Sequence, residues 1–100
     1  MDVSDLSPYP GGDLIRQGLE DLAQGRESEA AFLVLIGAPR LRRLGLKIPA
    51  GNATPPEHKL YELLAESDPD SAHSRYNALI RRLVSFERAA ESTVDSFEKH

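Results

Sequence analysis

The chain has 100 residues, of which 40% are hydrophobic and 28% charged, and its formal net charge at pH 7 is −4. This length supports one hydrophobic core and not two, so we expect a single domain over residues 1–100. The absence of cysteine excludes a disulfide scaffold and a thiolate metal site, and the acidic balance argues against a protein that coats nucleic acid.

Glycine and proline separate segments whose apolar residues recur at helical spacing. Residues 1–12, which contain SPYPGG, are expected to form a flexible loop. A first helix is predicted from Asp13 to a stop near Gly25. Ser28 suits the N-cap of a second segment over 30–37, which is apolar on all sides and should be the most buried element. A core strand over this same segment remains the alternative, because periodicity does not distinguish the two in a fully apolar stretch.

The second half of the chain predicts one short and two longer helices. Residues 39–45, PRLRRLG, read as a short helical turn that begins at a proline and ends at a glycine. A loop follows, and Thr54 is the predicted N-cap of a third main helix that begins at one of the next two prolines. An Asp68 cap and Pro69 then predict the start of a long C-terminal helix.

These segments predict an all-α fold: a small irregular antiparallel bundle of four main helices plus one short helical turn, with a long C-terminal helix. The longest apolar run, Ala30–Ala38, is far shorter than the roughly 20 residues that cross a bilayer. We therefore expect a cytoplasmic protein that has no membrane partner. The expected core consists of Phe32, Leu33, Leu35, Ile36, Leu64, Leu79, Ile80 and Leu83.

Positive charge gathers in two stretches of this acidic chain. Residues 30–56 contain four bases and no acid, and residues 71–86 contain three arginines and no acid. If both stretches lie at one end of the bundle, their side chains share a positive field that suits an anionic partner. The arginines expected in that field are Arg40, Arg43, Arg75 and Arg82.

Four polar residues fall in the first two turns of the predicted C-terminal helix: His73, Arg75, Tyr76 and Asn77. His73 and Asn77 are four residues apart and therefore share a face. One interpretation is a polar pocket that binds an anionic group, and the other is that these side chains cap the helix or tie down the preceding loop. A small hydrolase that uses His73 is a third reading, but the chain has no Gly-rich phosphate loop, nucleophile elbow or HExxH motif. We therefore expect no catalytic residues, no metal site and no cofactor.

The function favoured by these patterns is a non-catalytic helical protein–protein interaction module, such as an accessory or antidote-type subunit. The alternative is an arginine-lined domain that binds nucleic acid or a phosphate ligand. Both interpretations use the arginines and the polar residues named above as binding residues.

The C-terminal helix also predicts self-association. At about 1.5 Å per residue, roughly 28 residues extend about 42 Å, which exceeds the expected diameter of a domain of this size. Its apolar residues recur every seven positions, as in coiled coils. A homodimer is therefore expected, with fraying over 92–100 as the alternative. The dimerisation residues are predicted to be Phe86, Ala90, Val94 and Phe97.

Overall fold

The computed structural model describes residue 6, residues 8–49 and residues 55–98, with side chains up to Thr93. The regular secondary structure of the described residues is entirely helical, so the predicted all-α fold is confirmed, and the apolar segment predicted over 30–37 is a helix up to Ile36 rather than a strand. The helices are α1 (Gly12–Ala23), α2 (Glu29–Ile36), α3 (Ala38–Arg43), α4 (Pro56–Ser67) and α5 (Ala72–Glu98).

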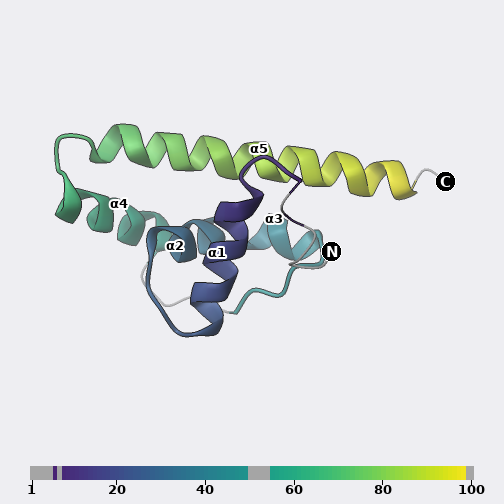
Figure 1. Cartoon of the computed structure of the whole chain (residues 1–100), viewed down its shortest axis with the longest axis horizontal. Coiled ribbons are helices and arrows are strands. Elements are labelled where there is room, and N and C mark those ends of the chain that lie inside the picture. The colour runs from purple at the N-terminus through teal and green to yellow at the C-terminus, as the bar shows by residue number, and fades with distance from the viewer. Residues whose placement is uncertain (1–5, 7, 50–54, 99–100) are drawn as a thin grey trace.

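Helix α5 runs along most of the length of the molecule, and the other four helices lie along one side of it (Figure 1). α2 packs against α1, α3, α4 and α5, which places it at the centre of the bundle. α4 lies antiparallel to α5, and the C-terminal end of α5 extends beyond the other helices, as its length predicts (Figure 1). The resulting molecule is elongated, with extents of 48 × 25 × 21 Å.

The junction between α1 and α2 is stabilised by the predicted Ser28 cap. The Ser28 hydroxyl accepts a hydrogen bond from the Ala31 backbone N–H at 3.0 Å and donates one to Asp21 Oδ2 at 2.6 Å. Asp21 also pairs with Arg26 Nη2 at 3.0 Å. The hydrogen bond from Ser28 holds the pKa of Asp21 below its ordinary value. This network therefore fixes the end of α1 to the beginning of α2.

α1 and α2 also approach each other closely because of a glycine. A Cβ atom on Gly18 would lie 2.3 Å from the Ala30 carbonyl oxygen and 2.5 Å from Val34 Cγ2. Both distances are well inside van der Waals contact, so the two helices reach this separation only because residue 18 lacks a side chain.

The start of α5 differs from the prediction by three residues. The Asp68 side chain accepts a hydrogen bond from the Asp70 N–H at 3.2 Å, and its carbonyl accepts one from the Ser71 N–H at 3.3 Å. This local turn competes with the helix, so α5 begins at Ala72 and not at Pro69. The predicted Thr54 cap lies outside the described residues.

The core only partly agrees with the prediction. Phe32, Leu33, Leu64 and Leu83 are buried, whereas the other four expected core residues, Leu35, Ile36, Leu79 and Ile80, are half-buried at its edge. Several fully buried side chains were missing from the expected core: Leu6, Ile15, Leu41, Leu60 and Phe86.

Residues 1–12 were expected to form a flexible loop, and the residues of this segment that the structure describes are packed onto the bundle. Leu6 is completely buried, and the Tyr9 ring meets the Phe86 ring edge-on, with centroids 5.8 Å apart and an interplanar angle of 85°. Phe86 and Ala90 are both fully buried in the single chain. They are therefore core residues of the single chain, and the homodimer itself stays a prediction.

The remaining two predicted dimerisation side chains, Val94 and Phe97, lie outside the described side chains. In the described part of the chain, none of the helices has the length and apolar character required to cross a membrane.

Candidate functional site: a groove between α3 and α5

The structure does not bring the four arginines of the expected positive field together. Arg40 and Arg43 lie on α3, which sits beside the C-terminal half of α5 (Figure 1). Arg75 lies near the start of α5, about 18 Å along the helix axis from Glu87, and pairs with Glu29 Oε1 at 2.9 Å. The expected common field of four arginines is therefore not formed.

Arg82 also lies away from α3. It precedes Val84 by two residues, which is about 200° around an α-helix, so the two side chains project from opposite sides of α5. The Arg82 carbonyl oxygen lies 2.9 Å from where a Cβ atom of Gly11 would stand. Arg82 thus belongs to the side of α5 that packs against the N-terminal segment.

The polar residues at the start of α5 have local partners. His73 Nε2 and Asn77 Nδ2 are 3.2 Å apart on the exposed surface, as their four-residue spacing predicts. The Tyr76 ring lies 5.9 Å from the Tyr61 ring, and burial raises the pKa of the Tyr76 hydroxyl. These contacts favour the interpretation in which the residues tie α5 to α4 and to α2, rather than a ligand pocket.

A groove of about 320 Å³ lies between the α2–α3 junction and α5. A Cβ atom on Gly37 would lie 2.8 Å from Leu83 Cδ1, so the glycine allows the α2–α3 junction to come this close to α5. The apolar residues that line the groove are Ile36, Gly37, Pro39, Ile80, Leu83 and Val84, and the charged ones are Arg40, Arg43 and Glu87.

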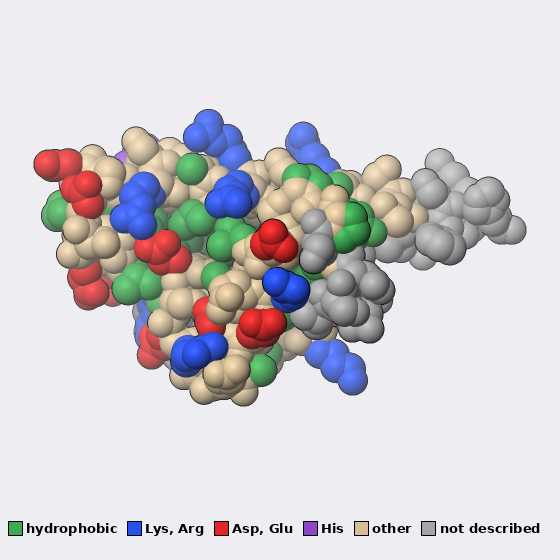
Figure 2. Space-filling model, in the orientation of Figure 1, with side chains coloured by type: hydrophobic (Ala, Val, Ile, Leu, Met, Phe, Trp, Pro, Cys, Tyr) green, Lys and Arg blue, Asp and Glu red, His purple; other side chains and the backbone are tan. Residues whose placement is uncertain are grey.

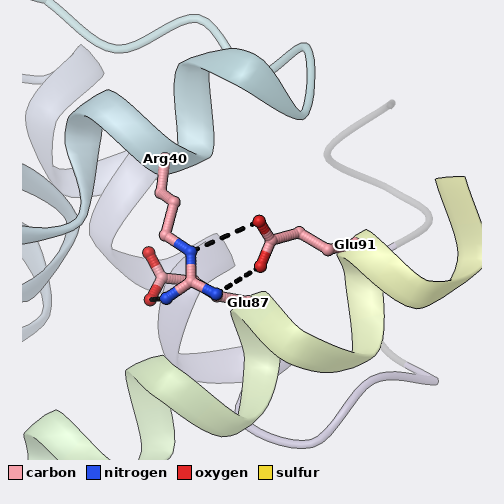
Figure 3. Close-up of polar contacts among 3 residues, drawn as sticks. All are labelled: Arg40, Glu87 and Glu91. Carbon is pink, nitrogen blue, oxygen red and sulfur yellow. Dashed lines mark hydrogen bonds and ion pairs between the residues drawn. The ribbon is translucent and has the colours of Figure 1, made fainter. Parts of the chain in front are cut away.

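Arg40 joins the two helices at the charged end of this groove (Figure 3). Its Nη1 donates to Glu87 Oε1 at 3.3 Å, its Nε donates to Glu91 Oε2 at 3.3 Å, and its Nη2 donates to the second oxygen of Glu91. The side chains form a clasp between α3 and α5, which we call the Arg40 clasp (Arg40, Glu87 and Glu91).

The two carboxylates of the Arg40 clasp have opposite electrostatic environments. Glu87 is only 3% exposed, and burial raises its pKa above the ordinary value. The hydrogen bond from Arg40 instead lowers the pKa of Glu91 and raises that of Arg40. One guanidinium therefore compensates a buried and a half-exposed carboxylate, and it has little capacity left for a further anion.

Positive side chains border the groove on both helices. On α5, Arg81 lies three residues before Val84 and Arg88 four residues after it, so both adjoin the same face. Neither forms an ion pair with any residue that the structure describes. On α3, Arg43 is exposed, and its charge opposes the rise that burial causes in the pKa of Glu87 and contributes to the lowered pKa of Glu91.

The space-filling view shows how the charged side chains are distributed over one face of the molecule. Lys and Arg side chains are spaced along α5, and Asp and Glu side chains lie at the end of the molecule formed by α4 and the turn into α5 as well as over α1 (Figure 2). The acidic residues of that end include Glu66, Asp68 and Asp70, which are all exposed.

Two other cavities are lined by basic side chains that already interact with other residues of the chain. A cavity of about 210 Å³ beside α2 and α4 contains Lys59, which pairs with Glu27 Oε2 at 3.7 Å and lies 6.0 Å from the centre of the Phe32 ring. A shallow cavity of about 470 Å³ follows α3, and there Arg42 donates to the Ile48 carbonyl at 3.0 Å and thereby closes the loop. Within the described ranges, no three His, Asp or Glu side chains are grouped so as to hold a metal ion.

The groove is distinguished by Val84, which is half-buried, lines it and does not belong to the hydrophobic core of the described residues. Sequence reasoning identified Arg40 and Arg43 but missed the apolar wall, the carboxylates of the clasp and the flanking Arg81 and Arg88. Comparisons with protein-family models, with curated proteins and with solved structures found no match for this chain.

Proposed function

We propose that this protein is a non-catalytic interaction module that binds a partner protein through the groove between α3 and α5. The observation that carries the proposal is the combination of an apolar wall with cationic borders. Val84 adds apolar surface that the chain's own core does not use. Apolar pockets of this kind bind the central side chains of a partner, and polar borders set its orientation.

The groove has the rigidity that such a role requires. Its α3 side is fixed to α5 by the Arg40 clasp, and its floor contains Leu83, which is 4% exposed and part of the core. Because both walls are held in place before binding, little conformational entropy is lost when a partner segment enters. We place this activity in the cytoplasm, in an accessory or antidote-type subunit.

The experiment that tests the proposal is photo-cross-linking in the source cells, with a benzophenone amino acid at position 84. The matched control is position 78, where Ala78 is exposed, lies on the same helix and projects about 120° away from Val84. We expect a discrete adduct from position 84 whose cross-linked peptide maps to one partner segment by mass spectrometry. Equal adduct patterns at the two positions, or none at either, would refute docking in the groove.

A second candidate function is binding of nucleic acid or a phosphate ligand, and one observation favours it. Arg81, Arg82 and Arg88 are exposed and form no ion pair with a described residue. If they contact phosphates, affinity for a labelled RNA falls steeply as salt is added, and Arg81→Ala with Arg88→Ala reduces that salt dependence. If the groove instead binds protein, we expect no RNA binding even at low salt.

A further inference from the structure

We propose that the partner segment is an amphipathic α-helix whose apolar stripe enters the groove and whose flanking positions carry Asp or Glu. This inference rests on the proposed function and adds to it the chemistry of the partner. It follows from the length of the groove along α5, from the position of the arginines on its borders and from the kinds of side chain that line it.

The length of the groove along α5 matches two turns of a helix. The apolar lining residues of α5 run from Ile80 to Val84, about 6 Å along the helix axis, and the groove continues to Glu87, about 10 Å from Ile80. An α-helix advances about 5.4 Å per turn, so a partner helix lying along α5 presents two or three side chains, at positions i, i+3 or i+4 and i+7, over this distance. The two walls come from α3 and α5, which leaves an opening bounded on both sides, as helix-in-groove recognition requires.

The charges bordering the wall select acidic flanks. Arg81 and Arg88 are seven residues apart, so they repeat along α5 with the same two-turn spacing, and Arg43 lies on the opposite border. The negative charges of Glu87 and Glu91 are already compensated by Arg40. A partner helix with carboxylates beside its apolar stripe therefore meets three arginines, whereas a basic helix meets three like charges.

The chemistry of the wall disfavours nucleic acid as the occupant. Single-stranded nucleic acid is held mainly by stacking of its bases on aromatic side chains. The described residues that line the groove are aliphatic or charged and include no aromatic ring. A row of aliphatic side chains between cationic borders instead complements an amphipathic acidic helix.

The test is a displayed library of helical peptides. Each peptide has Leu at positions i, i+4 and i+7, and its flanking positions are randomised among Glu, Gln and Lys. The library is selected on the full-length protein, and enriched peptides are measured by fluorescence anisotropy against three variants. Val84→Glu blocks the groove, Ala78→Glu adds the same charge elsewhere on α5, and Arg81→Glu with Arg88→Glu reverses the border.

We expect enrichment of Glu at the flanking positions, a loss of affinity of at least about tenfold with Val84→Glu, and little change with Ala78→Glu. The border reversal is expected to shift the preference from Glu-flanked to Lys-flanked peptides. Circular dichroism of each variant establishes that it is folded.

The outcomes separate this inference from the proposed function. Peptides that need Val84 but carry Lys or Gln at their flanks overturn the acidic-helix inference and leave the docking proposal standing. If none of the selected peptides binds the unmodified protein more tightly than the Val84→Glu variant, the acidic-helix inference and the proposed function are both overturned. A homodimer in sedimentation equilibrium that Val84→Glu dissociates also overturns the inference, because the occupant is then a second copy of this chain.

Discussion

The burial of Phe86 leads to a prediction that separates a core residue from a dimer contact. The Phe86 ring is completely buried and is met edge-on by the Tyr9 ring at 5.8 Å. Truncation of a buried phenylalanine to alanine removes its apolar contacts and leaves a cavity, which costs about 3–5 kcal/mol. A domain of this size typically unfolds with about 5–15 kcal/mol, so Phe86→Ala should remove a large part of the stability.

The size of the effect can be checked by two further variants. For a domain of this size, about 1 kcal/mol lowers Tm by about 4–8 °C, so Phe86→Ala should lower Tm by at least about 12 °C. Phe86→Leu keeps most of the volume and should cost less than Phe86→Ala. A double-mutant cycle of Phe86→Leu with Tyr9→Leu should give a coupling energy of about 0.5–1.5 kcal/mol for the ring pair.

The assay is urea unfolding followed by far-UV circular dichroism at two protein concentrations that differ by an order of magnitude. A core residue gives a loss of stability that is independent of concentration. If Phe86 instead lies in a dimer interface, the unfolding midpoint of the unmodified protein depends on concentration, and the variant loses that dependence. That result, or a loss below about 1 kcal/mol, would refute the packing described above.

Three further predictions use the same unfolding assay. Gly18→Ala should destabilise the protein by about 1–3 kcal/mol despite the better helix propensity of alanine, because the new methyl collides with the Ala30 carbonyl, and a neutral result would contradict this close approach. Ser28→Ala should cost about 1 kcal/mol through loss of the cap, whereas Ser28→Thr should retain most of it, and equal losses would argue against capping. Burial raises the pKa of Glu87 in the folded state, so the folded state binds the carboxyl proton of Glu87 more tightly than the unfolded state does. The contribution of Glu87 to the free energy of unfolding therefore falls as the pH rises above the ordinary pKa of glutamate. The stability of Glu87→Gln relative to the unmodified protein should therefore increase from acidic to neutral pH, and a difference that does not change with pH would contradict the burial of this carboxylate.

Features of the fold that depend on neighbouring residues could be predicted from the sequence. Ser28 marks the start of α2 because a hydroxyl at that position satisfies a backbone N–H three residues later, which is a local interaction. Helices α1 and α3 end just before Gly25 and Gly45, and these glycines adopt positive φ angles of 72° and 96° that terminate a helix. The start of α5 could not be placed correctly, because the Asp68 side chain can either cap a helix or form the turn that it forms here.

Features that depend on distant parts of the chain could not be predicted in the same way. The heptad spacing of Tyr76, Leu83 and Ala90 correctly indicates one apolar face on α5, but the spacing does not say what covers it. In the structure this face is covered by the chain itself: the N-terminal segment meets Phe86, and the α2–α3 junction meets Leu83. The N-terminal segment, which is rich in proline and glycine, thus packs against Phe86, a residue that was expected to contact a second copy of the chain.

The position of Glu87 shows what additional reasoning would have located the groove. Glu87 lies four residues after Leu83 and three before Ala90, so its place on α5 is on the buried face. A carboxylate at a buried position needs a positive partner, and the residues three and four positions away on α5 offer none, since Glu91 has the same charge. The compensating charge must therefore come from outside α5, where the acid-free stretch 30–56 contains the most arginines. Arg40 supplies it from 47 positions away, and the same contact that compensates the buried charge brings α3 against α5 and forms the end of the groove.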